Sequence, residues 1–288
     1  MKIAKRNARA LVIAMGMPLM LCAQGIWDPK EGMAGKRPYD TRVVPYPHVS
    51  EADVMWSKRL WRYIDLKEKM NLPLAYPKSS QPLEERRNLF DIIHDAVLEG
   101  TVTAYEAYDG LQSTDEFTHP ISLDRVDELG MEKPDTVLII DPVTGKEYEQ
   151  VIPHPFDRDR VVMFKLKEDW FFDKKRSVME CRIVGIAPVI EVYSESGEFM
   201  GLRDFYWVYF PEIRPVLAQY PVMLRQTHVF NLNFDDLFAK RMFSSVVVKE
   251  SNVYDRYIKE YKTGMDALLE AQDIKSDVMN FEQDLWEY

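Results

Sequence analysis

A run of large side chains near residue 205 limits the folds that this chain of 288 residues can adopt. From Phe205 to Phe210 every residue is aromatic or β-branched. Successive side chains of a β-strand point to opposite faces of its sheet, so a strand with this sequence has two apolar faces. The sequence therefore predicts a sheet that is covered on both faces, either by helices of this chain or by another molecule.

Four further segments carry the residues that strands prefer. They are residues 136–141, 146–152, 177–193 and 243–249. The loop at 194–198 has hairpin character, so residues 199–210 are expected to return antiparallel to 177–193. Residues 160–172 fit a helix and a strand equally well. The central part of the chain is therefore expected to form a mainly antiparallel sheet.

The segment after Ser50 has a helical pattern. Ser50 and Asp53 fit a variant of the capping box, in which an acid stands three residues after a hydroxyl cap. The predicted helix runs to about Met70, shortly before Pro73. Its buried stripe has a four-residue spacing and consists of Trp56, Leu60 and Ile64, with Trp61 beside it. Its exposed side is expected to carry Lys58, Arg59 and Arg62.

Similar patterns predict six further helices. They are residues 83–99, 103–109, 211–220, 234–242, 252–262 and 265–286. In the first of them Leu89, Ile93, Ala96 and Val97 form the inward face, and His94 is expected to be exposed or half-buried. The last one is acidic and is expected to dock on its own domain, with docking on a partner as the open alternative. The prediction is an α+β fold with N-terminal helices packed on a mainly antiparallel sheet, an extended N-terminal arm and C-terminal helices.

Residues 1–23 have the features of a secretory signal peptide. Four basic residues precede an apolar run from Ala10 to Leu21, which at about 1.5 Å per residue is too short to span a bilayer as a helix. Cleavage after Ala23 is favoured over acylation of Cys22, because acylated cysteines usually follow Gly, Ala or Ser. Loss of four bases and no acid changes the net charge from −10 to −14.

Residues 24–50 are rich in proline and glycine, which disfavour a helix. They are expected to form an extended arm, and residues 51–288 the folded domain. Two interpretations of the arm stay open. It is either a tail that docks only locally or an arm that lies on a neighbouring subunit through Trp27, Tyr39 and Tyr46.

The composition excludes several classes of protein. Hydrophobic residues make up 46% and charged residues 29%, values typical of a globular protein and not of a disordered or polytopic membrane chain. The 47 acids outnumber the 37 bases, so no broad basic surface is available for nucleic acid or anionic lipid.

The sequence contains no recognisable catalytic or cofactor motif. No two of the five histidines have the spacing of a helical metal site, and no phosphate-binding loop or nucleophile elbow occurs. After loss of Cys22, Cys181 stands alone and is expected to be a small buried residue. Asp157 and Asp159 could form the carboxylate pair of a hydrolase, but the arginines that alternate with them favour a structural ion-pair ladder. No catalytic residue, cofactor or metal ligand is therefore predicted.

Three segments are more specific than these patterns. They are Trp56–Asn71 with Pro73–Pro77, Lys167–Ser177 with Arg182–Pro188, and Phe205–Arg214. Together they closely resemble the GldN/PorN family of gliding-motility and type IX secretion proteins, and they bracket residues 56–214.

The resemblance implies a non-enzymatic periplasmic subunit. In this family the protein binds an outer-membrane lipoprotein of the GldK/PorK type, and many copies of the pair build a ring beneath the outer membrane. The ring is linked to a motor of the GldL/GldM type. The part of the motor expected to contact the ring is the periplasmic domain of the GldM/PorM-type protein. No membrane span and no nucleic acid are expected.

The candidate residues form two groups. The family signature, expected to serve mostly as architecture, consists of Trp56, Arg59, Trp61, Arg62 and Asp65. The candidate interface consists of Trp27, Trp170, Phe171, Phe172, Asp173, Phe205, Trp207, Tyr209 and Trp286. Two alternatives stay open: a periplasmic hydrolase with paired carboxylates in a pocket, and a monomeric protein that binds peptide or glycan in an aromatic groove.

Overall fold

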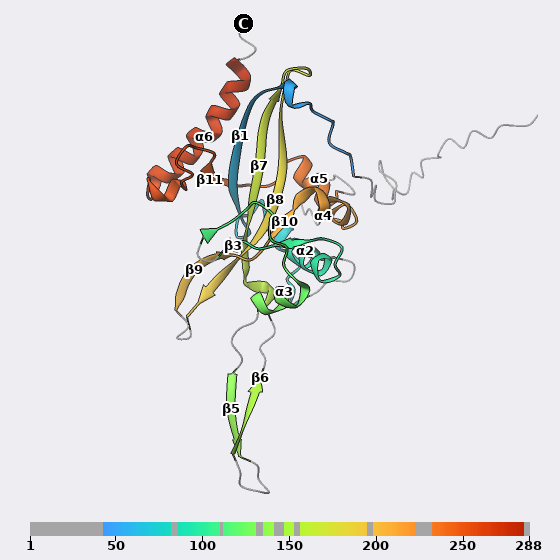
Figure 1. The fold of residues 1–288 in the computed structure, drawn as a ribbon, viewed down its shortest axis with the longest axis vertical. Helices are drawn as coiled ribbons and strands as arrows, with labels where there is room; N and C mark the ends of the chain where they lie inside the picture. The colour runs from blue at the N-terminus through green and yellow to red at the C-terminus, as the bar shows by residue number, and fades with distance from the viewer. Residues whose placement is uncertain are drawn as a thin grey trace, which may run out of the picture. The chain divides into compact units, whose positions relative to one another are not determined.

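The computed structural model in Figure 1 describes part of the chain. The described residues are 43–81, 86–109, 112–130, 135–140, 147–152, 156–194, 198–222 and 232–284. The predicted signal peptide at 1–23, residues 24–42 of the predicted arm, and Trp286 lie outside them.

Seven strands of the described chain form one antiparallel sheet, in the order β11-β1-β7-β8-β10-β2 with β9 beside β8. Their bounds are β1 Val54–Asp65, β2 Ala104–Tyr105, β7 Val161–Asp173, β8 Val178–Tyr193, β9 Phe199–Asp204, β10 Trp207–Tyr209 and β11 Val246–Glu250. Two small ladders pair β3 Tyr108–Asp109 with β4 Gln112–Ser113, and β5 Asp135–Ile140 with β6 Glu147–Ile152. The described helices are α1 Leu72–Ala75, α2 Leu89–Leu98, α3 Leu123–Gly130, α4 Phe210–Leu217, α5 Phe234–Ala239 and α6 Met265–Asp284. The predicted α+β fold is confirmed.

Most of the predicted strands are confirmed. The two runs at 136–141 and 146–152 become β5 and β6, and 177–193 becomes β8. The segment 199–210 returns antiparallel to β8 as two strands, β9 and β10, and its last residue begins α4. The ambiguous segment 160–172 is the strand β7, and the run at 243–249 becomes β11, which begins three residues later than predicted.

The predicted helix from Ser50 to about Met70 is wrong. Val54–Asp65 is the strand β1, which pairs with β7 on one side and with β11 on the other. The four-residue spacing of its apolar stripe fits a period of two as well as a period of 3.6, and its aromatic and β-branched residues prefer strands. Ser50 makes no side-chain cap, and only a short 3-10 turn, Glu51–Asp53, precedes the strand.

The exposed basic face predicted for this segment is also wrong. In a strand, Lys58 and Arg62 alternate onto the same face as Leu60 and Ile64. Arg62 is therefore buried, with 5% of its surface exposed. Arg59 points to the opposite face and stays exposed.

The helix predictions are confirmed for α4, α5 and α6, and in part for α2. The helix predicted from residue 83 begins only at Leu89, because the Asn88 side chain accepts a hydrogen bond from Asp91 N and caps it. Its predicted inward face is buried, but His94 is buried as well, which corrects the expectation of an exposed or half-buried residue. Residues 103–109 form β2 and β3 instead of a helix, and 252–262 contains only the 3-10 turn Ile258–Glu260.

Both faces of the sheet are covered by this chain. On one face, helices α2, α4 and α5 pack over the end near β8 and β10, and α6 packs beside β1 and β11 (Figure 1). On the opposite face, Tyr105, Ala107, Tyr108 and Phe117 pack in one cluster with Trp61 and Trp207. The two-faced segment near residue 205 is therefore buried by its own chain except at Tyr209, with Tyr206 and Trp207 fully covered.

The ion-pair ladder predicted within residues 157–160 is wrong, because Arg158 pairs with acids of another element. Arg158 reaches α2, where its Nη1 lies 3.1 Å from Asp91 Oδ1 and 2.9 Å from Asp95 Oδ1. Asp157 accepts from the Asp159 backbone nitrogen at 3.0 Å and caps a 3-10 turn. The arginine joins two elements, because its long side chain extends past its sequence neighbours to the acidic first and second turns of α2.

Candidate interface and the charged cleft

The five signature residues make contacts within the chain, on both faces of β1. Trp56 stacks on Phe281 of α6, with ring centroids 4.7 Å apart. Arg59 donates two hydrogen bonds to Asp169 of β7, at 2.5 and 2.9 Å. Asp65 ends the strand and accepts from the Lys67 backbone nitrogen at 2.8 Å.

Trp61 is the centre of the face opposite α6. Its indole Nε1 donates to the carboxylate of Asp115, and the ammonium of Lys249 lies 4.5 Å from the ring centroid. Lys167 reaches the same region and donates to the Asp115 carbonyl at 2.7 Å. Burial lowers the pKa of Lys167, although the Asp115 carboxylate opposes this effect. These contacts fix residues near 115 to the sheet.

Arg62 belongs to a buried charge cluster with Glu168 and Arg241. Glu168 is opposite Leu60 in the register and is completely buried. Arg241 Nη2 donates to its two carboxylate oxygens at 2.9 and 3.2 Å, and Arg62 Nε lies 3.3 Å from Oε2. Trp170 Nε1 donates to the same Oε2 at 3.0 Å. Two guanidinium groups thus share one carboxylate.

The pKa shifts in this cluster follow from burial and charge. Burial lowers the pKa of Arg62, and Glu168 only partly offsets that effect. In Arg241 burial acts in the same direction, but the carboxylate of Glu168 outweighs it and raises the pKa. Burial also raises the pKa of the Cys181 thiol well above its ordinary value. Cys181 is therefore a neutral thiol, whose sulfur accepts from Arg241 Nη1 at 3.1 Å.

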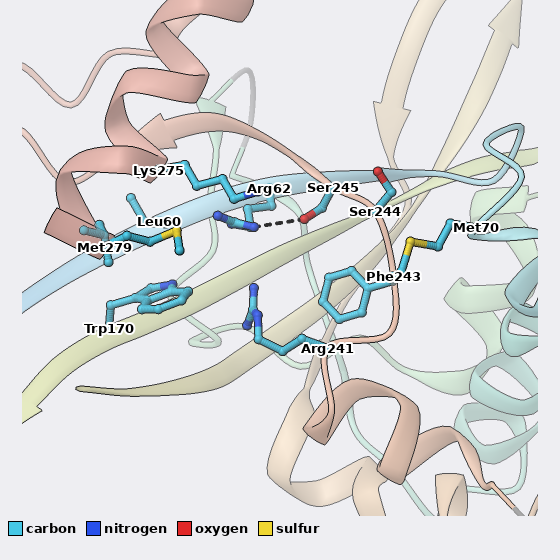
Figure 2. A pocket seen from close by; sticks show the side chains of 11 residues that line it. Leu60, Arg62, Met70, Trp170, Arg241, Phe243, Ser244, Ser245, Lys275 and Met279 are labelled. Atoms are coloured by element: carbon cyan, nitrogen blue, oxygen red, sulfur yellow. Dashed lines mark hydrogen bonds between the residues drawn. The ribbon is translucent and has the colours of Figure 1, made fainter. Parts of the chain in front are cut away.

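An open cleft of about 490 Å³ lies above this cluster, between α6 and the segment that follows α5. Figure 2 shows Arg62, Arg241 and Trp170 directed toward it, with Arg62 donating to Ser245 Oγ. Lys275 of α6 lines the cleft as well. The apolar part of the lining comes from Leu60, Met70, Phe243, Val278 and Met279.

A second buried ion pair lies on the opposite face of the sheet. Lys165 Nζ donates to Asp204 Oδ2 at 2.6 Å and to the Tyr257 hydroxyl at 2.9 Å. Burial by itself lowers the pKa of Lys165, but the Asp204 carboxylate outweighs it and leaves the pKa above its ordinary value. Burial also raises the pKa of Tyr63 to about 12. The ammonium is held in its charged form by groups of the same chain.

The structure places the candidate interface residues mostly inside the protein. Phe171, Phe172, Asp173, Phe205 and Trp207 are buried. Trp170 is half-buried in the cleft lining, and Tyr209 is 41% exposed. Trp27 and Trp286 lie outside the described residues. Among the described candidates, Tyr209 and Trp170 are therefore the two with surface to offer a partner.

The first described residues of the arm dock on their own chain. The Tyr46 ring lies between two guanidinium groups, with Arg214 at 4.4 Å and Arg182 at 5.2 Å from its centroid. Arg182 also donates to the Pro47 carbonyl at 2.6 Å. Arg214 is held in turn by a buried pair with Asp235, at 2.7 Å. For Tyr46, local docking is the interpretation that the structure supports.

Sequence reasoning missed two features of this surface. The first is the charge cluster, whose only signal is an acid, Glu168, in the middle of the alternating apolar positions of β7. The second is the β8–β9 hairpin, which exposes Tyr193, Phe199, Met200 and Leu202. Tyr193 and Phe199 are cross-strand neighbours with rings 5.9 Å apart. Their exposure depends on β9 lying at the edge of the sheet, which the sequence does not specify.

The described residues contain no group of three or more His, Cys, Asp or Glu side chains arranged to hold a metal ion. Within the same residues, no helix has the length and apolar character needed to cross a bilayer. The acids suggested for a hydrolase, Asp157 and Asp159, cap a turn and accept from the Ser79 backbone nitrogen, respectively. Neither lines the charged cleft.

The described residues therefore define an α+β protein whose aromatic residues mainly connect its own elements and whose cleft carries charge without a metal cluster. Comparison with known families extends this description. The family model for GldN, the gliding motility associated protein, matches residues 49–287, and the chain belongs to this family. A search of the curated proteins finds no match.

Family membership gives the general function. The chain is a component of the gliding-motility and type IX secretion machinery. Its family is a structural one and not a known enzyme family, and it acts in the periplasm. The resemblance seen in the three sequence segments is confirmed over most of the chain.

Proposed function

We propose that this chain is a structural subunit of a periplasmic ring, which it forms together with an outer-membrane lipoprotein of the GldK/PorK type. The ring takes up force from a GldL/GldM-type motor through the periplasmic GldM/PorM domain. In this proposal residues 1–23 are removed on export, residues 24–50 form the arm and residues 51–288 form the domain. The lipoprotein holds the assembly at the inner face of the outer membrane.

The family match over residues 49–287 carries this proposal, because it covers nearly the whole described domain. The exposed apolar side chains of the β8–β9 hairpin are in keeping with a subunit that binds other proteins. A ring requires two different patches on each subunit, since head-to-tail contacts close by rotation. The hairpin and Tyr209 are candidates for one patch, and the cleft beside α6 for another.

The test is co-expression of the mature chain with its lipoprotein, from which the acylated cysteine is removed. We expect a complex of many copies in light scattering after size exclusion, and closed rings in electron micrographs. Each protein expressed alone is the control. Persistent monomers with no co-purifying lipoprotein would contradict the proposal and favour a monomeric binding protein.

The hairpin allows a matched pair of variants in the same assay. Phe199→Asp places a charge on a side chain that is 58% exposed next to Tyr193. Val253→Asp places the same charge on a side chain that is 97% exposed elsewhere on the surface. We expect the first to weaken assembly and the second to leave it intact. Equal assembly by both variants would exclude the hairpin as an interface.

A further inference from the structure

The charged cleft has more positive charge than its own residues neutralise. Arg62, Arg241 and Lys275 all line it, and one buried carboxylate, that of Glu168, pairs with both arginines. Lys275 has no ion-pair partner among the residues that the structure describes. Three cations against one anion leave an excess of about two charges at the cleft. Lys275 is exposed to solvent, so the desolvated part of this positive charge is carried by the two arginines. The summed positive charge of the three side chains favours an anionic ligand in the cleft.

One of the arginines also has unused donor capacity. Arg62 is buried, and its Nη1 donates to Ser245 Oγ at 3.0 Å. Its Nε faces Glu168 at 3.3 Å but makes no hydrogen bond. Because Nε is buried and directed at Glu168, a ligand oxygen in the cleft would have to bind the terminal nitrogens, Nη1 and Nη2, of which the described contacts use one hydrogen, in the bond to Ser245.

The apolar part of the lining indicates that the anion is not a free inorganic ion. Met70 and Met279 are each more than half exposed at the cleft, and Phe243 and Trp170 form its aromatic part. Flexible methionines are common at surfaces that bind peptides, and Arg with Trp is typical of the residues that dominate protein interfaces. A volume of about 490 Å³ accommodates a carboxylate together with a neighbouring large apolar side chain.

We propose that this cleft binds a segment of a partner protein of the machinery, in which a carboxylate lies next to a large apolar side chain. The inference rests on the proposed function, because it assigns one contact of that assembly to a site. A partner protein is the favoured source over a second copy of this chain. Two copies of the mature chain, each with an expected net charge of −14, repel one another at long range.

The binding test uses the full mature chain labelled with 5-fluorotryptophan, so that Trp170 reports on the cleft by fluorine NMR. Trp170→Phe identifies its signal. The probe is the peptide acetyl-Leu-Asp-Phe-amide, and its matched control has Asn in place of Asp. We expect the Asp peptide to shift the Trp170 signal and to bind about tenfold more tightly than the Asn peptide. The Asn peptide has no carboxylate to pair with the cations of the cleft.

Lys275→Gln is the main variant, since Lys275 has no internal ion pair to break. We expect it to weaken the Asp peptide several-fold, whereas Lys174→Gln, at an exposed lysine of the β7–β8 turn, leaves binding unchanged. Absence of a shift at millimolar peptide, or equal binding of the two peptides, would overturn the proposal. An equal shift with sodium phosphate would replace it with a site for inorganic anions. A shift that depends on protein concentration alone would replace the partner with a second copy.

Co-purification separates this inference from the proposed function. Lys275→Glu is tested with the lipoprotein and with the periplasmic motor domain, in parallel with Lys174→Glu. Loss of one complex in the first variant only supports docking at the cleft. If both variants form both complexes normally, the cleft proposal fails and the proposed function stands. If the wild-type chain binds neither protein, the proposed function fails, whatever the peptide result.

Discussion

Replacement of Glu168 by Gln tests whether the buried charge cluster holds the sheet and the segment after α5 together. The substitution keeps the size of the side chain but removes the charge that two guanidinium groups share. Its amide nitrogen would also face donors, since Arg241 approaches both carboxylate oxygens within 3.2 Å. Removal of one partner from a buried ion pair typically costs about 3–5 kcal/mol, because the other charge stays buried and uncompensated. Arg62, which is 5% exposed, is that charge.

The expected loss is measured by urea unfolding at neutral pH and by calorimetry, where it corresponds to a decrease in Tm of about 6–20 °C. Arg59→Gln is the matched control, because it breaks a pair with Asp169 that is exposed on both sides and worth about 0–1 kcal/mol. A second control replaces Arg62, Glu168 and Arg241 together by Met, Leu and Met, which should recover most of the lost stability. A Glu168→Gln protein within about 1 kcal/mol of the wild type would refute the reasoning.

Three further predictions follow from packing and ionisation. Burial raises the pKa of Tyr63 to about 12, above its ordinary 10.0, so the neutral phenol contributes stability that is complete below pH 10 and is lost as the pH rises to about 12. Over this pH range, the free energy of unfolding measured with urea should fall by up to about 3 kcal/mol more in the wild type than in Tyr63→Phe. An equal pH dependence of the two free energies would contradict this. A Cβ at Gly185 would lie 2.4 Å from the Phe117 ring, so Gly185→Ala should destabilise the protein by about 1–3 kcal/mol. Adding Phe117→Leu to this variant should recover part of the lost stability. No recovery would show that the strain does not come from the Phe117 ring. Trp56→Ala removes the stack on α6, worth about 0.5–1.5 kcal/mol beyond area burial, and should accelerate hydrogen exchange of α6 amides but not of α2 amides.

The sequence predicted the fold class and the long hairpin because those depend on local patterns with a single period. Met179, Cys181 and Ile183 alternate with charged residues at the period of a strand, and Val178–Tyr193 forms β8. The segment around Trp56 is different, because a spacing of four residues satisfies both periods. This segment is a strand because it pairs with β7 and β11, which are distant in the sequence, and its own residues do not specify that pairing. The same error placed Arg62 on the surface, since the side on which a residue lies depends on the period assumed.

The site was harder to predict than the fold because its residues come from separate strands and loops. Glu168, Arg62 and Arg241 are far apart in the sequence, and only the register of β1 with β7 brings the first two together. The signal available was one charged residue among buried alternating positions. A charge on a buried face requires a partner, and that argument could have marked Glu168, although it does not name Arg241.

Many aromatic residues of this protein contact cations of the same chain, and this affects where a partner is expected to bind. At Tyr46, Trp61 and Trp170, each ring lies against a guanidinium or ammonium group of this chain. These cation–π contacts join loops and the N-terminal segment to the sheet. They stabilise the attachment of these segments without additional buried apolar side chains.

Aromatic content alone is therefore a poor guide to where a partner of this protein would bind. Exposed apolar side chains and uncompensated charge are better guides. The β8–β9 hairpin has the first, and the cleft around Lys275 combines both, with Met70 and Met279 beside the lysine. If the cleft binds a partner as proposed, its charge and not its aromatic residues should therefore decide that binding.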